Sequence, residues 1–105
     1  MADEAEPDAP LPDELVVEFP EIVVGNNRVS FVKLQEPTGI QVRKAEREMA
    51  TRVDVETMRA YQFALVSLVS GVPREIIERM PISKLNEASR YIQGFIELGP
   101  QTGKT

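Results

Sequence analysis

Residue types that could do catalytic chemistry are sparse in this chain. It contains no Cys and no His among its 105 residues, which removes the thiol nucleophile, the commonest general base and most zinc ligands. The remaining candidates are two carboxylate pairs interleaved with Arg, Glu46 with Glu48 and Glu75 with Glu78. Acids and bases mixed at helical spacing are typical of a solvated helix face. We therefore predict a protein that is not an enzyme and that binds no cofactor or metal.

The C-terminal residues resemble a phosphate-binding loop only in part. Three residues separate Gly99 from Gly103-Lys104-Thr105, whereas the phosphate-binding motif has four between its glycines and opens a helix. Here the pattern predicts a helix before the glycines and none after them. We expect residues 100–105 to be a flexible C-terminus and not a nucleotide site.

Charge is concentrated at the N-terminus. Of the 17 acids, six lie in residues 1–14 together with three prolines and no base, which leaves 11 acids against 12 bases in residues 15–105. Such an acidic, proline-rich segment is typical of a disordered tail. The nearly neutral remainder lacks the basic stripe that binding to nucleic acid or to an anionic membrane requires. We therefore expect neither nucleic acid nor membrane as a partner.

The sequence predicts neither a membrane-spanning helix nor a secretory signal. No run approaches the 18 apolar residues of a membrane-spanning helix, and the acidic N-terminus lacks the basic start and apolar run of a secretory signal. The expected location is a cytoplasm.

Two β-rich runs follow the acidic segment. Residues 15–24 and 29–34 are rich in Val, Ile, Leu and Phe, and Gly25-Asn26-Asn27 separates them. This pattern predicts a β-hairpin over residues 15–35. Pro20 interrupts the first run and indicates an edge position or a bulge, because proline cannot donate to a ladder. A two-stranded ribbon is marginal alone, so helices must pack on one of its faces.

Helical periodicity takes over from residue 39 to residue 99. Thr38 and Asp54 are good N-caps, Gly71 suits a helix stop, and Gly99-Pro100 is expected to end the last helix. The predicted helices cover residues 40–52, 55–70, 73–79 and 84–98. The sequence therefore predicts one α+β, mainly α domain over residues 15–99, in the order ββαααα.

The helix predicted over residues 55–70 is apolar nearly all round, which is typical of a helix covered on most sides. It has more apolar surface than a hairpin and three modest helices would cover. Core packing accounts for most of it, and the excess predicts a surface for a partner helix. The candidate partner-binding residues are Phe63, Val66, Ile77 and Phe95.

A helix-turn-helix reading is the less favoured alternative for residues 63–92. Its second helix would carry Arg74 and Arg79, but Glu75 and Glu78 on the same short helix would approach the phosphates. The Ile76-Ile77 pair is expected to need a core. A helical corner packed on the central helix explains the segment better.

From Val29 onward the chain resembles the small tail assembly chaperones of long-tailed, Mu-like and P2-like bacteriophages. The resemblance covers about residues 15–98. Its residues are the junction Val29–Gly39, which ends Glu-Pro-Thr-Gly, the Gly71-Val72-Pro73 break, the short helix Arg74–Met80 and the closing helix Leu85–Ile96. The acidic residues 1–14 lie outside it.

This resemblance implies a non-enzymatic assembly factor that binds and solubilises the tape measure protein during tail morphogenesis. It also implies the host bacterial cytoplasm as location and absence from the mature virion. Further partners would be the tail tube protein, a frameshifted longer form of the chain, or a second copy in a homo-oligomer. The alternative from another class is a structural tail completion or connector protein, which would stay in the particle.

Overall fold

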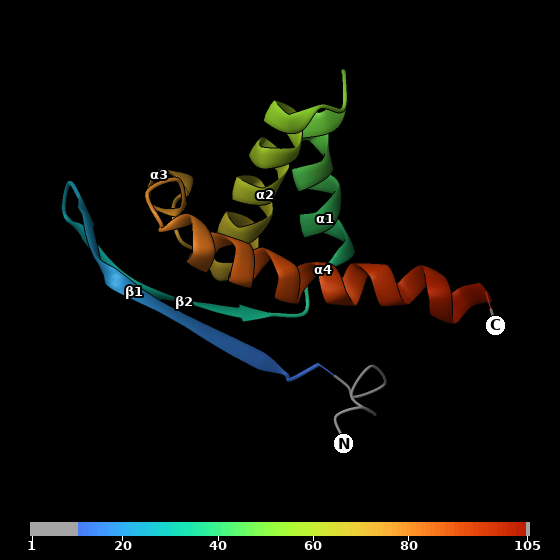
Figure 1. Ribbon diagram of the computed structural model, residues 1–105, viewed down its shortest axis with the longest axis horizontal. Helices are drawn as coiled ribbons and strands as arrows, with labels where there is room; N and C mark the ends of the chain where they lie inside the picture. The colour runs from blue at the N-terminus through green and yellow to red at the C-terminus, as the bar shows by residue number, and fades with distance from the viewer. Residues whose placement is uncertain (1–10, 105) are drawn as a thin grey trace.

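The computed structural model describes residues 11–104, with side chains described from residue 11 to residue 97. It begins with an antiparallel hairpin of β1 (Glu14–Val24) and β2 (Asn27–Gln35), as predicted. Gly25 turns the chain between them at φ 59°, in the left-handed region that glycine adopts at little cost. Figure 1 shows the hairpin as a long ribbon along one side of the helices.

The hairpin register is regular except beside Pro20. Pairing runs from Glu14 opposite Gln35 to Glu18 opposite Phe31, and resumes with Ile22 opposite Val29. The irregularity between Glu18 and Ile22 confirms the bulge that Pro20 predicted. One face is buried against the helices, with Val17, Phe19, Val32 and Leu34 in the core.

Within residues 11–104, four α-helices follow the hairpin, which confirms the predicted ββαααα order. They are α1 (Gly39–Glu46), α2 (Val55–Ser70), α3 (Arg74–Ile77) and α4 (Ile82–Lys104), and the short 3-10 helix η2 (Arg47–Met49) extends α1. The predicted caps are in place: Thr38 and Asp54 form capping boxes, and Gly71 ends α2 at φ 77°.

The last helix differs from its predicted bounds. α4 begins at Ile82 and continues through Gly99-Pro100 to Lys104, past the predicted end at Leu98. An internal proline removes one backbone hydrogen bond and crowds the carbonyl four residues earlier, which weakens a helix without forbidding it. The Gly99-Pro100 pair is therefore not sufficient to predict where α4 ends.

The N-terminal boundary differs as well. Leu11 packs against the core, and the Tyr91 hydroxyl donates a hydrogen bond to the Pro12 carbonyl at 2.5 Å. The folded body therefore includes residues 11–14, which composition alone assigned to the acidic tail. The rest of the predicted tail, residues 1–10, lies outside the described residues.

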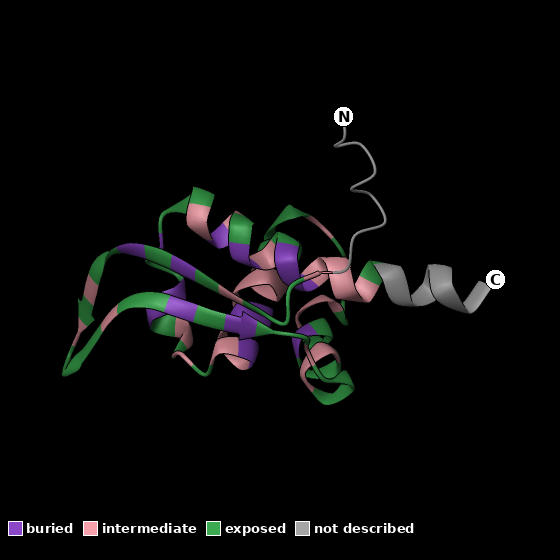
Figure 2. Ribbon diagram, turned by 90° about the horizontal axis from the view of Figure 1, so that it is seen from below, coloured by how far each residue is buried: buried purple, intermediate pink, exposed green. Residues whose placement is uncertain are grey.

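The core lies where the hairpin meets α2, α3 and α4. Its largest fully buried side chains include Leu34, Leu65, Ile77, Leu85 and Ile92. Figure 2 shows the buried residues where the strands and helices face one another, while much of the outer face of the hairpin is exposed. α1 packs on α2, and the Gln41 side chain ties the two together by donating to the Leu68 carbonyl at 3.1 Å. In the part of the chain that the structure describes, no helix is long and apolar enough to cross a membrane.

Candidate functional site

An open groove of about 420 Å³ lies between η2, the first half of α2 and the middle of α4. We call it the α2–α4 groove. One wall is apolar and comes from η2 and the start of α2, and the other carries polar side chains of α2 and α4. Its lining residues are Met49, Val55, Met58, Arg59, Tyr61, Gln62, Ser89 and Gln93.

The apolar side chains at and beside this wall are largely exposed. Val55 is 81% exposed and Met58 is 53% exposed, and Val53 in the preceding loop is 70% exposed. These three residues surround the start of α2, with Met49 on the groove side. Clustered exposure of this kind is characteristic of interaction surfaces.

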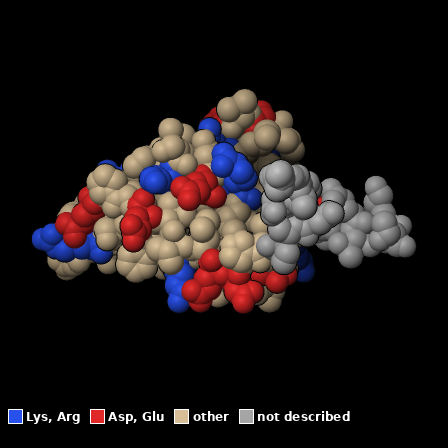
Figure 3. Space-filling view, turned by 60° about the horizontal axis from the view of Figure 1, so that its bottom comes forward, with Lys and Arg blue, Asp and Glu red and all other residues tan. Residues whose placement is uncertain are grey.

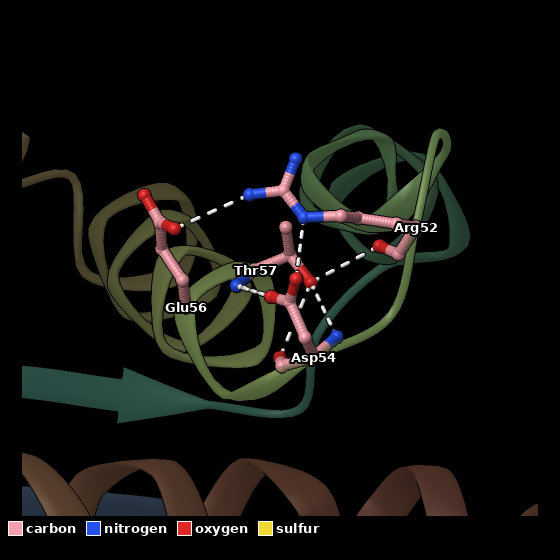
Figure 4. Close-up of polar contacts among 4 residues, drawn as sticks. All are labelled: Arg52, Asp54, Glu56 and Thr57. Carbon is pink, nitrogen blue, oxygen red and sulfur yellow. Dashed lines mark hydrogen bonds and ion pairs between the residues drawn. The ribbon is translucent and has the colours of Figure 1, made fainter.

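A polar cluster at the start of α2 holds this wall in place (Figure 4). The Asp54 carboxylate accepts from the Thr57 backbone N–H, and the Thr57 hydroxyl accepts from the Asp54 backbone N–H, both at 2.9 Å. The Arg52 guanidinium donates to Asp54 and, at 3.2 Å, to Glu56. The chain entering α2 is thereby fixed between Val53 and Val55.

The charge of Asp54 contributes to this cap. Its hydrogen bond from the Thr57 backbone and then the Arg52 guanidinium hold the pKa of the carboxyl below its ordinary value. Asp54 is therefore ionised at neutral pH, and its negative charge lies at the N-terminus of α2, where the helix dipole favours it.

An ion pair supports the η2 side of the groove. Arg74 of α3 donates to Glu48 of η2 at 3.0 Å and to Glu78 at 3.3 Å. Since Glu48 precedes Met49, this partly buried contact fixes the position at which Met49 enters the groove.

The polar wall is a set of hydrogen bonds between α2 and α4. The Tyr61 hydroxyl donates to the Gln93 side chain at 2.8 Å, and the Gln62 amide donates to Asn86 at 2.9 Å. The Arg59 guanidinium donates to Gln62 and, at 3.4 Å, to Asn86. These bonds set the distance between the two helices and so the width of the groove.

The polar side chains of the groove are suited to binding a partner chain. Burial and then the nearby Glu46 raise the pKa of Tyr61, so its hydroxyl stays protonated and donates. Among the described residues, no group of three or more acids is placed to hold a metal ion. Amides, a hydroxyl and one guanidinium around an apolar wall can orient a partner chain, because they offer both donors and acceptors.

Charges on the surface are mixed in sign. Figure 3 shows Lys and Arg in small separate groups on the face in view, with acidic side chains gathered along its lower edge and no continuous basic stripe over the coloured residues. This distribution agrees with the nearly neutral charge of residues 15–105. It offers no track of cations for a nucleic-acid backbone on that face.

The structure separates the four predicted partner-binding residues. Val66 and Ile77 are fully buried in the core, so neither can touch a partner in this fold, and their assignment as surface is corrected. They are buried because α2 and α3 pack against each other and against the hairpin. Phe63 is half-buried and packs against the core.

Phe95 is also half-buried and packs edge-on against Tyr91, with ring centroids 5.2 Å apart. It lines a smaller hollow of about 330 Å³ beside Pro37, Val42 and Ile96. Neither Phe63 nor Phe95 lines the α2–α4 groove, so the structure does not bring the four predicted residues together at one site.

Sequence reasoning missed the residues that do form the groove wall. Met58 shares a helical stripe with core residues, and periodicity alone assigned that stripe to the core. A signal was present in the placement of Val53 just before the Asp54 cap and Met58 four residues after it. Apolar residues at these two positions often pack together at the start of a helix. This pair therefore lies at the end of the helix and not in its middle, where neighbouring helices pack.

Comparison with known proteins supports an assembly role. Residues 15–97 match the family described as "Phage tail assembly chaperone proteins, E, or 41 or 14". No curated protein and no solved structure matches the chain. The match covers β1 from its second residue, all of β2, most of α4 and every residue of the α2–α4 groove. The chain belongs to the family of phage tail assembly chaperones.

Proposed function

We propose that this chaperone binds the tape measure protein through the α2–α4 groove and keeps it soluble until the tail tube forms around it. The observation that carries the proposal is the open groove itself, with Val53, Val55 and Met58 exposed beside it. The family match supports a role on tail proteins. The apolar wall supports recognition of an apolar helix face.

The energetics favour weak, reversible capture. Full burial of a Val or Met side chain contributes ~1.5–3 kcal/mol. Covering the exposed parts of Val53, Val55 and Met58 would then contribute about 3–6 kcal/mol, before the cost of association. Methionine adapts its shape to different partners, so one groove can accept successive helical turns of a long client. Several chaperones along one client would hold it by avidity.

The same proposal includes a cellular location and further partners. The chaperone would act in the host bacterial cytoplasm and leave before the virion is complete. The tail tube protein and a frameshifted longer form of the chain would be further partners. Phe63 and Phe95 stay predicted contacts, because each is partly exposed outside the groove.

The test is co-expression of the tape measure protein with groove variants. Met58→Glu removes about 1 kcal/mol of apolar contact and places a carboxylate against an apolar partner, so we expect at least about tenfold weaker binding and an insoluble client. Ile40→Glu is the matched control. Ile40 is 66% exposed on α1 and lies outside the groove.

Equal solubilisation by Met58→Glu and Ile40→Glu, with both variants folded by circular dichroism, would refute capture by this groove. Finding the chain in purified particles would instead favour a structural tail protein.

A further inference from the structure

One stripe of α2 faces the α2–α4 groove, and its character changes along the helix. Its members are spaced i, i+3, i+4 and i+7, which places them on the same side of a helix. They are Val55, Met58, Arg59 and Gln62. The stripe is apolar where it begins and polar where it ends, over a length of about 10 Å. A partner helix lying along it would meet an apolar surface and, one turn later, a polar one.

Arg59 supplies the charge of this stripe and is the one charged residue that lines the groove within the described residues. Its Nη1 atom donates to Gln62 Oε1 and, at 3.4 Å, to Asn86 Oδ1. The Gln62 amide also donates to Asn86, at 2.9 Å, so side chains of two helices hold the guanidinium in place. Because both bonds leave from Nη1, the edge formed by Nε and Nη2 is available to another acceptor.

The positive charge of Arg59 has no carboxylate within ion-pair distance in the described part of the chain. The acids that neighbour it are engaged with other cations. Glu56, one turn earlier on α2, pairs with Arg52 at 3.2 Å. Glu87 on α4 lies 3.9 Å from Lys84. The exposed guanidinium therefore offers an uncompensated charge to whatever enters the groove.

The two ends of the groove differ in charge. Burial and then the charge of Glu46 raise the pKa of Tyr61, which indicates that this acid lies near the Tyr61 end. Tyr61 bonds to Gln93, whereas Arg59 bonds to Asn86, two turns earlier on α4. A carboxylate of a partner is therefore attracted at the Arg59 end and repelled at the Tyr61 end.

We propose that Arg59 determines which helices the groove accepts, by pairing with an Asp or Glu side chain that lies one turn from the apolar residues contacting Val55 and Met58. This inference rests on the proposed function and adds the chemistry of the client segment that is bound. A carboxylate can accept two parallel hydrogen bonds from Nε and Nη2. A Lys or Arg at the same position of the client would be rejected by like charge.

The pair contributes selectivity more than affinity. An ion pair with an exposed guanidinium is weak, and it strengthens when a docked helix excludes water from it. We expect a carboxylate at this position to raise the affinity about three- to tenfold over a neutral amide. The preference should shrink in high salt, because salt screens partly exposed charges.

Three synthetic helical peptides isolate this pair. They share one row of leucines at helical spacing and differ at a single position, one turn from the leucines, which holds Glu, Gln or Lys. Isothermal titration calorimetry with the full chain should give the highest affinity for the Glu peptide and the lowest for the Lys peptide. Arg59→Gln should bind the Glu and Gln peptides equally, and Arg59→Glu should prefer the Lys peptide.

Arg79→Gln is the matched control. It makes the same change of charge at an exposed residue that does not line the groove, so it should keep the wild-type order of affinities. The reversed preference of Arg59→Glu also shows that this variant is folded, because an unfolded chain would bind no peptide selectively.

The possible failures point to different proposals. Equal affinity of the wild type for the three peptides, or an order that Arg59→Gln retains, would overturn the role of Arg59 and leave capture by the groove intact. Binding of none of the peptides would overturn it together with recognition of a helix face. The predicted order without any binding of the tape measure protein would uphold the role of Arg59 and refute the proposed function. Shifts of the Met58 methyl signal that grow with chain concentration in the absence of peptide would assign the groove to a second copy and overturn the inference.

Discussion

The contact between Leu11 and Gly94 gives a prediction in which two opposing effects can be separated. Gly94 lies inside α4 with no positive φ, so Gly94→Ala should stabilise the helix by ~1 kcal/mol. The new Cβ atom would, however, lie 2.9 Å from Leu11 Cδ1, 3.5 Å from Cδ2 and 3.8 Å from Cγ. Leu11 must rotate away, and a displaced rotamer costs about 0.5–1.5 kcal/mol.

The two effects nearly cancel in the wild type and separate in a double-mutant cycle. Gly94→Ala should change the free energy of unfolding little when Leu11 is present, and raise it by ~1 kcal/mol in a Leu11→Ala background. Urea unfolding followed by circular dichroism measures all four proteins. The same gain in both backgrounds would show that Leu11 does not lie on Gly94, and the start of the folded body at Leu11 would be refuted.

Three further predictions concern the fold. Leu65→Ala, in the fully buried core, should lower the free energy of unfolding by ~2–5 kcal/mol, measured by urea unfolding. Gly71→Ala, at φ 77°, should lower the melting temperature, because a left-handed backbone costs other residues about 1–2 kcal/mol; an unchanged melting temperature would contradict that conformation. Asp54→Asn keeps the cap but removes the charge. Because the folded-state pKa of Asp54 is lowered, its charge stabilises the fold above the ordinary pKa near 3.8, and this advantage is lost as pH falls through the folded-state value. The stability difference between wild type and variant should therefore shrink in acid, and a constant difference would contradict the assignment.

Local signals account for the parts of the fold that were predicted correctly. Gly25 with Asn26 specified the turn, Pro20 specified the bulge, and Thr38 and Asp54 specified two helix starts. Each of these depends on the conformational limits of one or two residues, which hold wherever the segment packs.

The parts that were missed depend on contacts between distant segments. Leu11 belongs to the body because it meets Gly94, which no local pattern shows. Periodicity places Met58, Leu65 and Val66 on or near an apolar surface of one helix. Periodicity does not predict that Leu65 and Val66 are fully buried while Met58 is exposed in the groove. That difference is set by where the hairpin and α4 pack against α2.

Methionine methyl NMR of the complex with the tape measure protein tests the central claim most directly. Met49 and Met58 line the groove, whereas Met80 is buried in the core at 6% exposure and serves as an internal control. Client binding in the groove predicts large shifts of the Met49 and Met58 methyl signals with Met80 nearly unchanged. A complex that forms while both groove methyl signals stay in place would contradict the account.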